Sequence, residues 1–223
     1  MPGFLLPDCR PWRIKSPGFF QLGSPCMAEP PPDPSSRSPF VVWEGAFDTE
    51  MLKAFAQYAD GLPHKHGTVD VGNEQYDRHT RVTRVAWLER NPQTERFYSR
   101  LEEIILSLNS EFYQYDLSAM VPLQHVVYEG SDQGHLDWHI DYARESEQKG
   151  SEFRKLSLSI QLSEPSEYEG GELQARVRGK VDVAPKTFGT VIAFSSFTLH
   201  RVTLVTAGVR KAIIVWVLGP DFH

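Results

Sequence analysis

Two overlapping His-x-Asp pairs lie side by side in this 223-residue chain: His135 with Asp137, and His139 with Asp141. Side chains alternate between the two faces of a β-strand, so a strand here would place all four residues on one face. One such pair and a distant histidine form a two-histidine, one-carboxylate facial triad, which leaves coordination positions on the metal open and suits a non-haem Fe(II) oxygenase. The residues alone leave open which pair binds the metal.

His200 is the best candidate for the third ligand, because it lies in a second segment, 194–202, that is typical of a strand. The other histidines have no such setting. They lie in a polar loop, lack a carboxylate at strand spacing, or end the chain: His64, His66, His79, His125 and His223. We therefore interpret these as residues without a metal-binding role.

Arg210 follows His200 closely in the sequence. An iron oxygenase of this kind needs a dicarboxylate co-substrate, and a guanidinium binds a carboxylate through two parallel hydrogen bonds. Taken alone, an arginine in a buried strand is more often part of a structural ion pair. Beside a complete facial triad, Arg210 becomes a candidate co-substrate ligand.

The bulk composition indicates one globular domain that can bury a substantial core, with 40% hydrophobic and 12% aromatic residues. The net charge is −6 and no Lys/Arg cluster stands out, so we expect no nucleic-acid partner. No long apolar run predicts a membrane span, and the N-terminus lacks a signal-peptide core. Only Cys9 and Cys26 are present, which agrees with a reducing compartment, so we expect a cytoplasmic protein.

Residues 1–39 hold ten of the sixteen prolines, and the run at 30–34 is nearly all proline. Such a segment is expected to be disordered or extended, and we place the domain at 40–223. Met27 precedes the proline run, which raises the hypothesis that translation starts there.

Two helices are expected before the strands. Asp48 is placed to cap a helix over 49–60, which Gly61 and Pro63 would end. Asn91 and Pro92 are typical of a cap and first position for a second helix. The apolar stripe of this helix should pack on a sheet: Phe97, Leu101, Ile104, Ile105 and Leu108.

The rest of the domain reads as strands separated by Gly, Pro and Ser. The polar stretches 64–80 and 142–153 are predicted to be loops bordering the site. Many short strands indicate a mainly β fold of two facing sheets, an eight-stranded jelly roll supported by the N-terminal helices. The expected strands are 81–88, 120–128, 134–141, 155–162, 172–177, 190–194, 198–204 and 210–218.

The C-terminal half resembles the prolyl 4-hydroxylase-like branch of the 2-oxoglutarate- and Fe(II)-dependent oxygenases, especially bacterial and phage members. The resemblance covers roughly residues 115–220, and it rests on an ordered set of segments rather than on any one of them. The matching text is DWHID at 137–141, RKLS at 154–157, EPSEYEGGEL at 164–173, FSSFTLHRV at 194–202, Arg210 and WVLGP at 216–220.

The resemblance chooses between the two pairs: His139 and Asp141, with His200, would be the metal ligands and the catalytic centre. It implies Fe(II), O2 and 2-oxoglutarate as co-substrate, whose far carboxylate would meet Arg210. Tyr128 resembles a family tyrosine that hydrogen-bonds near the co-substrate, although a core aromatic is a competing interpretation. The implied reaction hydroxylates a prolyl residue or other aliphatic carbon and releases succinate and CO2, and relatives use ascorbate as a reductant. His135 and Asp137 keep an open role on the substrate side or at the surface.

Two positions depart from the family pattern. Leu204 stands where the family often has proline, and Ala212 stands where a hydroxyl residue often follows the arginine. The second change removes a donor to the co-substrate carboxylate. Three residues are candidates to supply it instead: Tyr128, Gln161 and Thr206. Gly170 and Gly171 most simply indicate a tight turn.

A rival function is a cupin-like metal isomerase or a metal-dependent small-molecule binding protein, which has no need of Arg210. A jelly roll acting only as an interaction module is a third hypothesis, which the intact triad disfavours. The sequence leaves open whether the substrate is a peptide or a small molecule, and it leaves the oligomeric state open.

Overall fold

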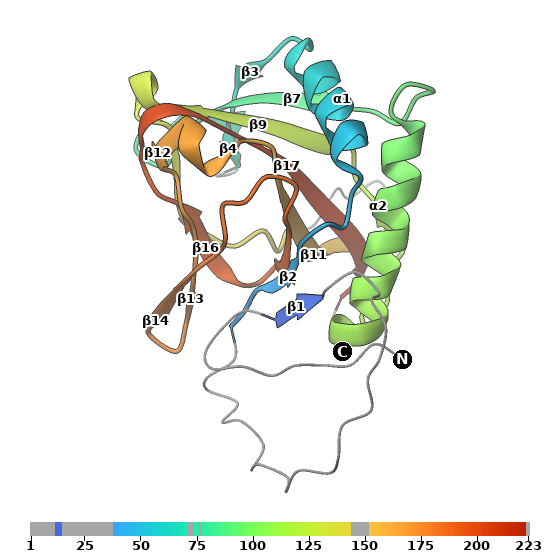
Figure 1. The fold of residues 1–223 in the computed structure, drawn as a ribbon. Helices are drawn as coiled ribbons and strands as arrows, with labels where there is room; N and C mark the ends of the chain where they lie inside the picture. The colour runs from blue at the N-terminus through green and yellow to red at the C-terminus, as the bar shows by residue number, and fades with distance from the viewer. Residues whose placement is uncertain (1–11, 15–37, 71–73, 76, 144–151, 222–223) are drawn as a thin grey trace, which may run out of the picture.

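Two β-sheets lie face to face in the computed structural model, which describes residues 12–14, 38–70, 74–75, 77–143 and 152–221. Figure 1 shows β13, β14 and β16 on one side of the molecule and both α-helices on the other. The larger sheet runs in the order β1 (Trp12–Ile14), β2 (Val41–Trp43), β15 (Val191–Ser195), β11 (Glu152–Gln161), β17 (Val205–Pro220), β9 (Leu123–Glu129), β7 (Arg84–Leu88) and β3 (Lys65–His66).

Short strands β8 (Ala119–Met120) and β12 (Tyr168–Gly170) also pair with β17. The smaller sheet runs β14 (Lys180–Val183), β13 (Leu173–Val177), β16 (Leu199–Val202), β10 (His135–His139) and β6 (Arg81–Val82). The strands β4 (Val69–Asp70) and β5 (Glu74–Gln75) form a separate ribbon. The predicted mainly β, two-sheet fold is confirmed.

Successive side chains on the strands of the larger sheet point to opposite faces, and each face contributes to a separate apolar core. On β11, Leu156, Leu158 and Ile160 pack against the helices. Ser157, Ser159 and Gln161 alternate with them and so face the smaller sheet. On β9, Val126 and Tyr128 face the smaller sheet and belong to the second core. The face under the helices is therefore apolar, and the face between the sheets carries the polar groups.

The helix α1 (Thr49–Asp60) agrees with the sequence prediction. The Asp48 side chain accepts a hydrogen bond from the Met51 backbone N–H at 2.9 Å, and Gly61 follows as the C-cap. The helix α2 (Glu95–Leu108) buries the predicted stripe but starts later than predicted. Asn91 Oδ1 accepts from the backbone N–H of Gln93 and Thr94, so it caps a turn that precedes the helix rather than the helix itself.

The predicted strand over 81–88 is divided between the two sheets. Its first part, β6, pairs with β10, and its second part, β7, pairs with β9. The break falls at Thr83, whose buried hydroxyl donates to the Val127 carbonyl at 2.9 Å. The chain therefore crosses from one sheet to the other at this residue, which a run of strand-forming residues does not reveal.

Three further findings concern segments predicted to be irregular. The stretch 64–80 contains β3, β4 and β5, because its backbone pairs with β7 and within the ribbon. Strand β14, which pairs with β13 in a hairpin, was not predicted. In the N-terminal segment, which was expected to be disordered or extended, Trp12–Ile14 is extended and forms a strand that pairs in parallel with Val41–Trp43. The rest of 1–37 and the Met27 hypothesis lie outside the described residues, and the domain boundary stays a prediction.

The structure also bears on the expected absence of a membrane span. Neither α1 nor α2, within the part of the chain described, is long and apolar enough to cross a membrane.

A buried histidine lies under α1, on the helix side of the larger sheet. His125 is fully buried, its Nδ1 is 2.9 Å from His64 Nε2, and its Nε2 is 3.8 Å from Asp60 Oδ1. Asp60 in turn pairs with Lys211 Nζ at 2.7 Å. Burial, together with His64 and Lys211, lowers the pKa of His125 from 6.5 to about 4, and Asp60 only partly opposes this.

Folding should therefore become less stable in mild acid. The unfolded chain takes up the His125 proton as the pH falls through 6.5, whereas the folded chain resists it until about pH 4. We expect wild-type protein to lose roughly 2 kcal/mol of unfolding free energy between pH 7 and pH 5 that His125→Asn does not lose. Urea denaturation at both pH values measures this difference. His66→Asn, at an exposed histidine, should behave as wild type. If His125→Asn lost as much unfolding free energy between pH 7 and pH 5 as wild type, His125 would not be the source of the acid sensitivity.

Candidate active site

His139, Asp141 and His200 come together on the inner face of the smaller sheet. His139 Nε2 lies 3.5 Å from Asp141 Oδ1, and His200 Nε2 lies 3.5 Å from Asp141 Oδ2. All three ligand atoms lie within 4.8 Å of one another, and no other such group of three occurs among the described residues. Two imidazoles and one carboxylate at this spacing form a donor set that fits Fe(II).

Backbone carbonyls fix which ring nitrogen of each histidine is available. His139 Nδ1 is 2.7 Å from the Asp137 carbonyl, and His200 Nδ1 is 2.8 Å from the Thr198 carbonyl. A carbonyl only accepts, so both Nδ1 atoms carry the hydrogen and donate it. In the neutral rings the lone pairs therefore lie on the Nε2 atoms, which face Asp141.

The surroundings favour an ionised Asp141 and a neutral His200. Burial by itself would raise the pKa of Asp141, but His200 and His139 outweigh it, and the pKa falls below its usual value. Burial lowers the pKa of His200, although Asp141 opposes this. These are the protonation states that a metal ion requires of its ligands.

A row of hydrogen bonds orients the Asp141 carboxylate. Ser157 Oγ donates to Asp141 Oδ2 at 2.8 Å, and Ser196 Oγ lies 2.9 Å from Ser157 Oγ. The backbone N–H groups of Asp141 and Tyr142 both donate to the Ser196 carbonyl at 2.8 Å. The position of Asp141, just beyond the end of β10, is thus set by β11 and by the turn between β15 and β16.

An irregularity in β10 overturns the expectation that all four residues of the two His-x-Asp pairs share a face. Leu136 pairs with Val202 and His139 pairs with His200, so β10 has one more residue than β16 over this interval. A bulge of this kind reverses the alternation and re-aims side chains. Leu136 and His139 therefore both line the cavity.

His135 and Asp137 do not line the cavity. The two His135 ring nitrogens lie 2.8 Å from the Gln133 carbonyl and 3.3 Å from the His79 carbonyl, while Asp137 is exposed. Trp138, between the pairs, packs against the guanidinium groups of Arg176 and Arg201, each 4.6 Å from its ring. Of the roles left open for His135 and Asp137, the structure supports a surface position.

Arg210 lies in the same cavity and is only 1% exposed. Its Nη2 donates to Gln161 Oε1 at 3.2 Å, and its guanidinium carbon lies 5.2 Å from the centre of the Tyr128 ring. Arg210 Nε and Nη1 are buried without a hydrogen-bond partner among the described residues. A buried guanidinium with vacant donors fits a carboxylate, which is the group at the far end of 2-oxoglutarate.

The sequence offered three replacements for the hydroxyl missing at Ala212, and the structure separates them. Gln161 contacts Arg210, and Tyr128 lines the cavity beside it. Thr206 is exposed on β17. Gln161 and Tyr128 remain candidates, and Thr206 does not.

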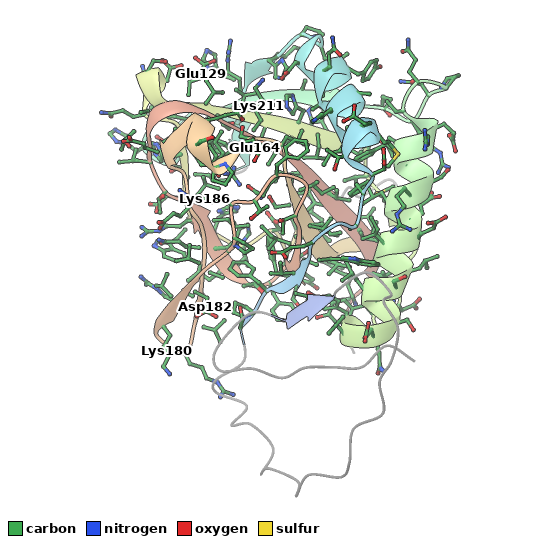
Figure 2. The ribbon with its side chains drawn as sticks, viewed as in Figure 1. Glu129, Glu164, Lys180, Asp182, Lys186 and Lys211 are labelled. Carbon is green, nitrogen blue, oxygen red and sulfur yellow. The ribbon has the colours of Figure 1, made fainter. Side chains whose placement is uncertain are left out.

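Tyr168 was missed as a site residue. Its ring and the Arg210 side chain both lie against Gly171, where an added Cβ would be 3.2 Å and 3.0 Å from them. Its buried hydroxyl lies close enough to Arg210 to interact with it but makes no well-aligned hydrogen bond within the described chain. Lys186 (Figure 2) covers the ring at 5.0 Å. Tyr168 lies within segment 164–173, which the resemblance to the family already covers. The sequence did not indicate that its side chain points toward Arg210. Gly170 and Gly171 have φ of +71° and +58°, which confirms the expected positive φ, although Gly170 belongs to β12, whose pairing with β17 is irregular there.

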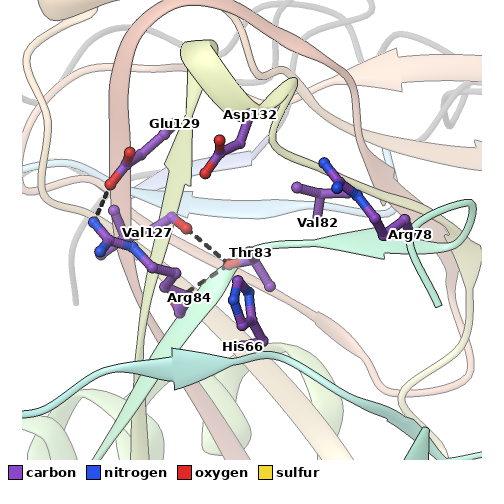
Figure 3. A pocket seen from close by; sticks show the side chains of 8 residues that line it. All are labelled: His66, Arg78, Val82, Thr83, Arg84, Val127, Glu129 and Asp132. Carbon is purple, nitrogen blue, oxygen red and sulfur yellow. Dashed lines mark hydrogen bonds and ion pairs between the residues drawn. The ribbon is translucent and has the colours of Figure 1, made fainter. Parts of the chain in front are cut away.

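The cavity that joins these groups has a volume of about 440 Å³ and runs between the two sheets. Trp87, Ile140 and Trp216 form apolar parts of its wall, and Trp87 and Ile140 are each 50% exposed. A smaller hollow of about 120 Å³ lies elsewhere, lined by His66, Arg84 and Glu129 among others (Figure 3). It shares no lining residue with the larger cavity.

The fold and the cluster together define a class of proteins, the jelly rolls with a metal site between their two sheets. Residues 123–218 match the sequence model of the 2OG-Fe(II) oxygenase superfamily. A PKHD-type hydroxylase of Shewanella sp. (strain ANA-3) is 34% identical over 105 residues, which cover 45% of this chain and 46% of the relative. The chain thus spans about half the length of the curated relatives it matches.

Two solved structures share the fold. A Trichoplax adhaerens prolyl hydroxylase, in complex with a hypoxia-inducible factor peptide fragment, superposes with a TM-score of 0.63 at 19% identity over 80% of this chain and 82% of its own. A Pseudomonas putida prolyl-4-hydroxylase superposes with a TM-score of 0.62 at 14% identity over 80% of this chain and 91% of its own. Residues 123–218, less than half of this chain, are thus similar to the 2OG-Fe(II) oxygenase superfamily, and the chain shares its fold with solved prolyl hydroxylases. The family resemblance is confirmed, and the cupin-like alternative is not favoured.

The two His-x-Asp pairs should differ in metal binding. His139→Ala removes an Nε2 that faces Asp141, so the variant should lose stoichiometric Fe(II) after anaerobic loading and desalting. His135→Ala changes only contacts to the Gln133 and His79 carbonyls and should retain the iron. Iron analysis of both variants checks this. Loss of iron in His135→Ala with retention in His139→Ala would reverse the assignment.

Ser157 should position Asp141 for the metal. Ser157→Ala removes the donor to Asp141 Oδ2, and loss of such a partner typically weakens metal affinity by roughly 10- to 100-fold. Competition titration with Co(II) measures the affinity. Ser163→Ala is the matched control, because Ser163 is also buried but bonds to the Val209 carbonyl. Unchanged Co(II) affinity in Ser157→Ala would show that the hydrogen bond has no such role.

Proposed function

We propose that this chain is a 2-oxoglutarate-dependent non-haem Fe(II) dioxygenase that hydroxylates a prolyl residue or another aliphatic carbon. In the overall reaction, one atom of O2 enters the hydroxylated carbon and the other enters succinate, as 2-oxoglutarate loses CO2. The observation that carries the proposal is the presence, in one cavity, of the histidine–aspartate cluster and a buried arginine with vacant donors.

His139, Asp141 and His200 would hold Fe(II), and the bound iron with 2-oxoglutarate supplies the oxidising chemistry. The protein supplies the geometry. The carbonyls that accept from the two Nδ1–H groups keep both Nε2 lone pairs directed at one point. Ser157 holds the carboxylate beside them. The three ligands therefore need little rearrangement to bind a metal.

Arg210 would bind the far carboxylate of 2-oxoglutarate through its vacant Nε–H and Nη1–H groups. Gln161 fixes the guanidinium from one side, and the Tyr168 hydroxyl is a further donor that has no other partner among the described residues. Tyr128 would hydrogen-bond nearer the metal, since it lines the same cavity. These residues orient the co-substrate and exclude water from its carboxylate.

Hydroxylation of a prolyl residue is the first proposal because the two structural neighbours are prolyl hydroxylases, one of them in complex with a peptide fragment. A small molecule is an alternative substrate for the same site. We also propose ascorbate as an auxiliary reductant, by resemblance to the family. A cytoplasmic location is proposed because the only cysteines are Cys9 and Cys26.

Binding of 2-oxoglutarate tests the proposal directly. Under anaerobic conditions, Fe(II) and 2-oxoglutarate should give wild-type protein a weak visible metal-to-ligand charge-transfer band. Arg210→Gln should retain iron and require roughly 10- to 100-fold more 2-oxoglutarate, because it loses charge-assisted hydrogen bonds. Arg201→Gln is the matched control, since Arg201 lies next to His200 but packs on Trp138 outside the cavity.

Under air, succinate should form with wild-type protein and not with His200→Ala. If no band appears and no succinate forms, the proposed function is wrong. If the band saturates at the same 2-oxoglutarate concentration in Arg210→Gln as in wild type, the role of Arg210 is wrong.

A further inference from the structure

A second arginine lines the cavity and has no part in the proposed binding of 2-oxoglutarate. Arg81 lies at the start of β6, on a different sheet from Arg210. Its Nη1 donates to the Thr68 carbonyl at 3.1 Å and its Nη2 donates to Gln124 Oε1 at 2.9 Å. A guanidinium has five N–H groups, so about three remain for other partners. Two hydrogen bonds therefore hold the Arg81 side chain in place and leave other N–H groups available for a ligand.

The backbone at Gly67 also fixes the guanidinium. A Cβ at this position would lie 2.5 Å from Arg81 Nε and 2.7 Å from Thr83 Cγ2, which is too close for either atom to stay in place. The missing side chain at position 67 thus lets the planar group lie on the backbone. Arg81 is pre-organised rather than free to swing into solvent.

No carboxylate in the described chain pairs with Arg81. Asp77 lines the same cavity, but its carboxylate accepts from Thr80 Oγ1 and the His79 backbone N–H. Asp141 belongs to the candidate metal site. Burial lowers the pKa of Arg81, and only Tyr128 and Asp141 oppose this shift. A cation taken out of water without a paired anion is costly, so the cavity favours a ligand that carries a negative charge.

The co-substrate does not account for this charge. Its far carboxylate is assigned to Arg210, whose guanidinium lies over the Tyr128 ring. Arg81 donates to Gln124, which pairs across the sheet with Trp87, and Trp87 and Ile140 of the cavity wall are each half exposed. Arg154 adds positive charge to the same wall, with its guanidinium 4.0 Å from the Trp216 ring. The cavity wall therefore combines cations with apolar surfaces.

We propose that Arg81 binds a carboxylate of the primary substrate. The substrate class is then a small carboxylic acid such as a free amino acid, whose hydrocarbon part lies against Trp87 and Ile140 while its target carbon faces the metal site. This inference rests on the proposed function and favours its alternative substrate, a small molecule, over a prolyl residue within a peptide. The cavity volume, about 440 Å³, lies at the low end of the roughly 300–1,000 Å³ of ligand pockets and must also hold the co-substrate.

Matched pairs of compounds test the charge requirement. Each L-amino acid is compared with its primary amide, which keeps the shape and the ammonium group but loses the carboxylate. A proline-containing peptide blocked at both ends represents a substrate without a free carboxylate. Succinate release above the substrate-free level, with a gain of one oxygen atom in the compound by mass spectrometry, is the readout. We expect at least one acid to be hydroxylated and its amide to be inactive.

Substitutions test whether Arg81 is the residue that binds the substrate carboxylate. Arg81→Gln should raise KM for the active acid by roughly 10- to 100-fold, as expected for the loss of a charge-assisted hydrogen bond. Gly67→Ala keeps the charge but displaces the guanidinium and should also raise KM. Arg84→Gln is the control, because Arg84 pairs with Glu129 in the separate hollow (Figure 3).

Three results would overturn the proposal: amides as active as acids, activity with the blocked peptide only, or no active acid. An unchanged KM in both Arg81→Gln and Gly67→Ala would show that Arg81 is only a structural clamp for Gln124 and Thr68. The anaerobic band of Fe(II) with 2-oxoglutarate separates these outcomes from failure of the proposed function. If wild-type protein forms the band but hydroxylates no carboxylic acid, only the inferred carboxylate substrate is wrong, and the proposed function stands.

Discussion

Each of the two faces of the larger sheet packs against a different environment, and this constrains the residues of every strand. One face packs under α1 and α2 and is apolar, while the other lines the cavity between the sheets and carries Ser157, Gln161 and Arg210. Because side chains alternate between Leu156 and Gln161 on β11, the polar residues of this stretch that serve the site are separated by apolar residues that anchor the strand. The site and the core are therefore built from the same strands, and neither can shift by one residue without moving the other.

Uncompensated positive charge is the second constraint. The chain as a whole carries a net charge of −6, yet Arg81 and Arg210 line the cavity without a paired carboxylate among the described residues. Enclosed guanidinium groups of this kind reduce the stability of the folded protein in the absence of ligand. Anions bound at each arginine, as proposed above, would offset this cost. The same argument supports the co-substrate assignment and the inferred carboxylate of the substrate.

Much of this organisation could be predicted from the sequence. The two His-x-Asp pairs, His200 and Arg210 indicated a metal site and a co-substrate ligand, and the family resemblance selected His139 and Asp141. The structure brings these two residues, His200 and Arg210 into one cavity. The Asp48 cap and the period-two runs of β9, β11 and β17 identified one helix start and the mainly β class. These signals are readable because they depend on local geometry: capping within one turn, and alternation within one strand. The roles of the individual residues in catalysis stay proposals.

Other features were decided only by tertiary contacts. The bulge in β10 turns His135 and Asp137 out of the cavity and His139 into it, although period two alone would have kept them together. The division of 81–88 at Thr83, and the meeting of Tyr168 with Arg210 across Gly171, also depend on partners distant in the sequence. The sequence by itself determined which chemical groups are available and on which strands they lie. Tertiary structure decided which of them face one another, because strand register and bulges are set by the pairing of whole strands and not by the residues of one strand.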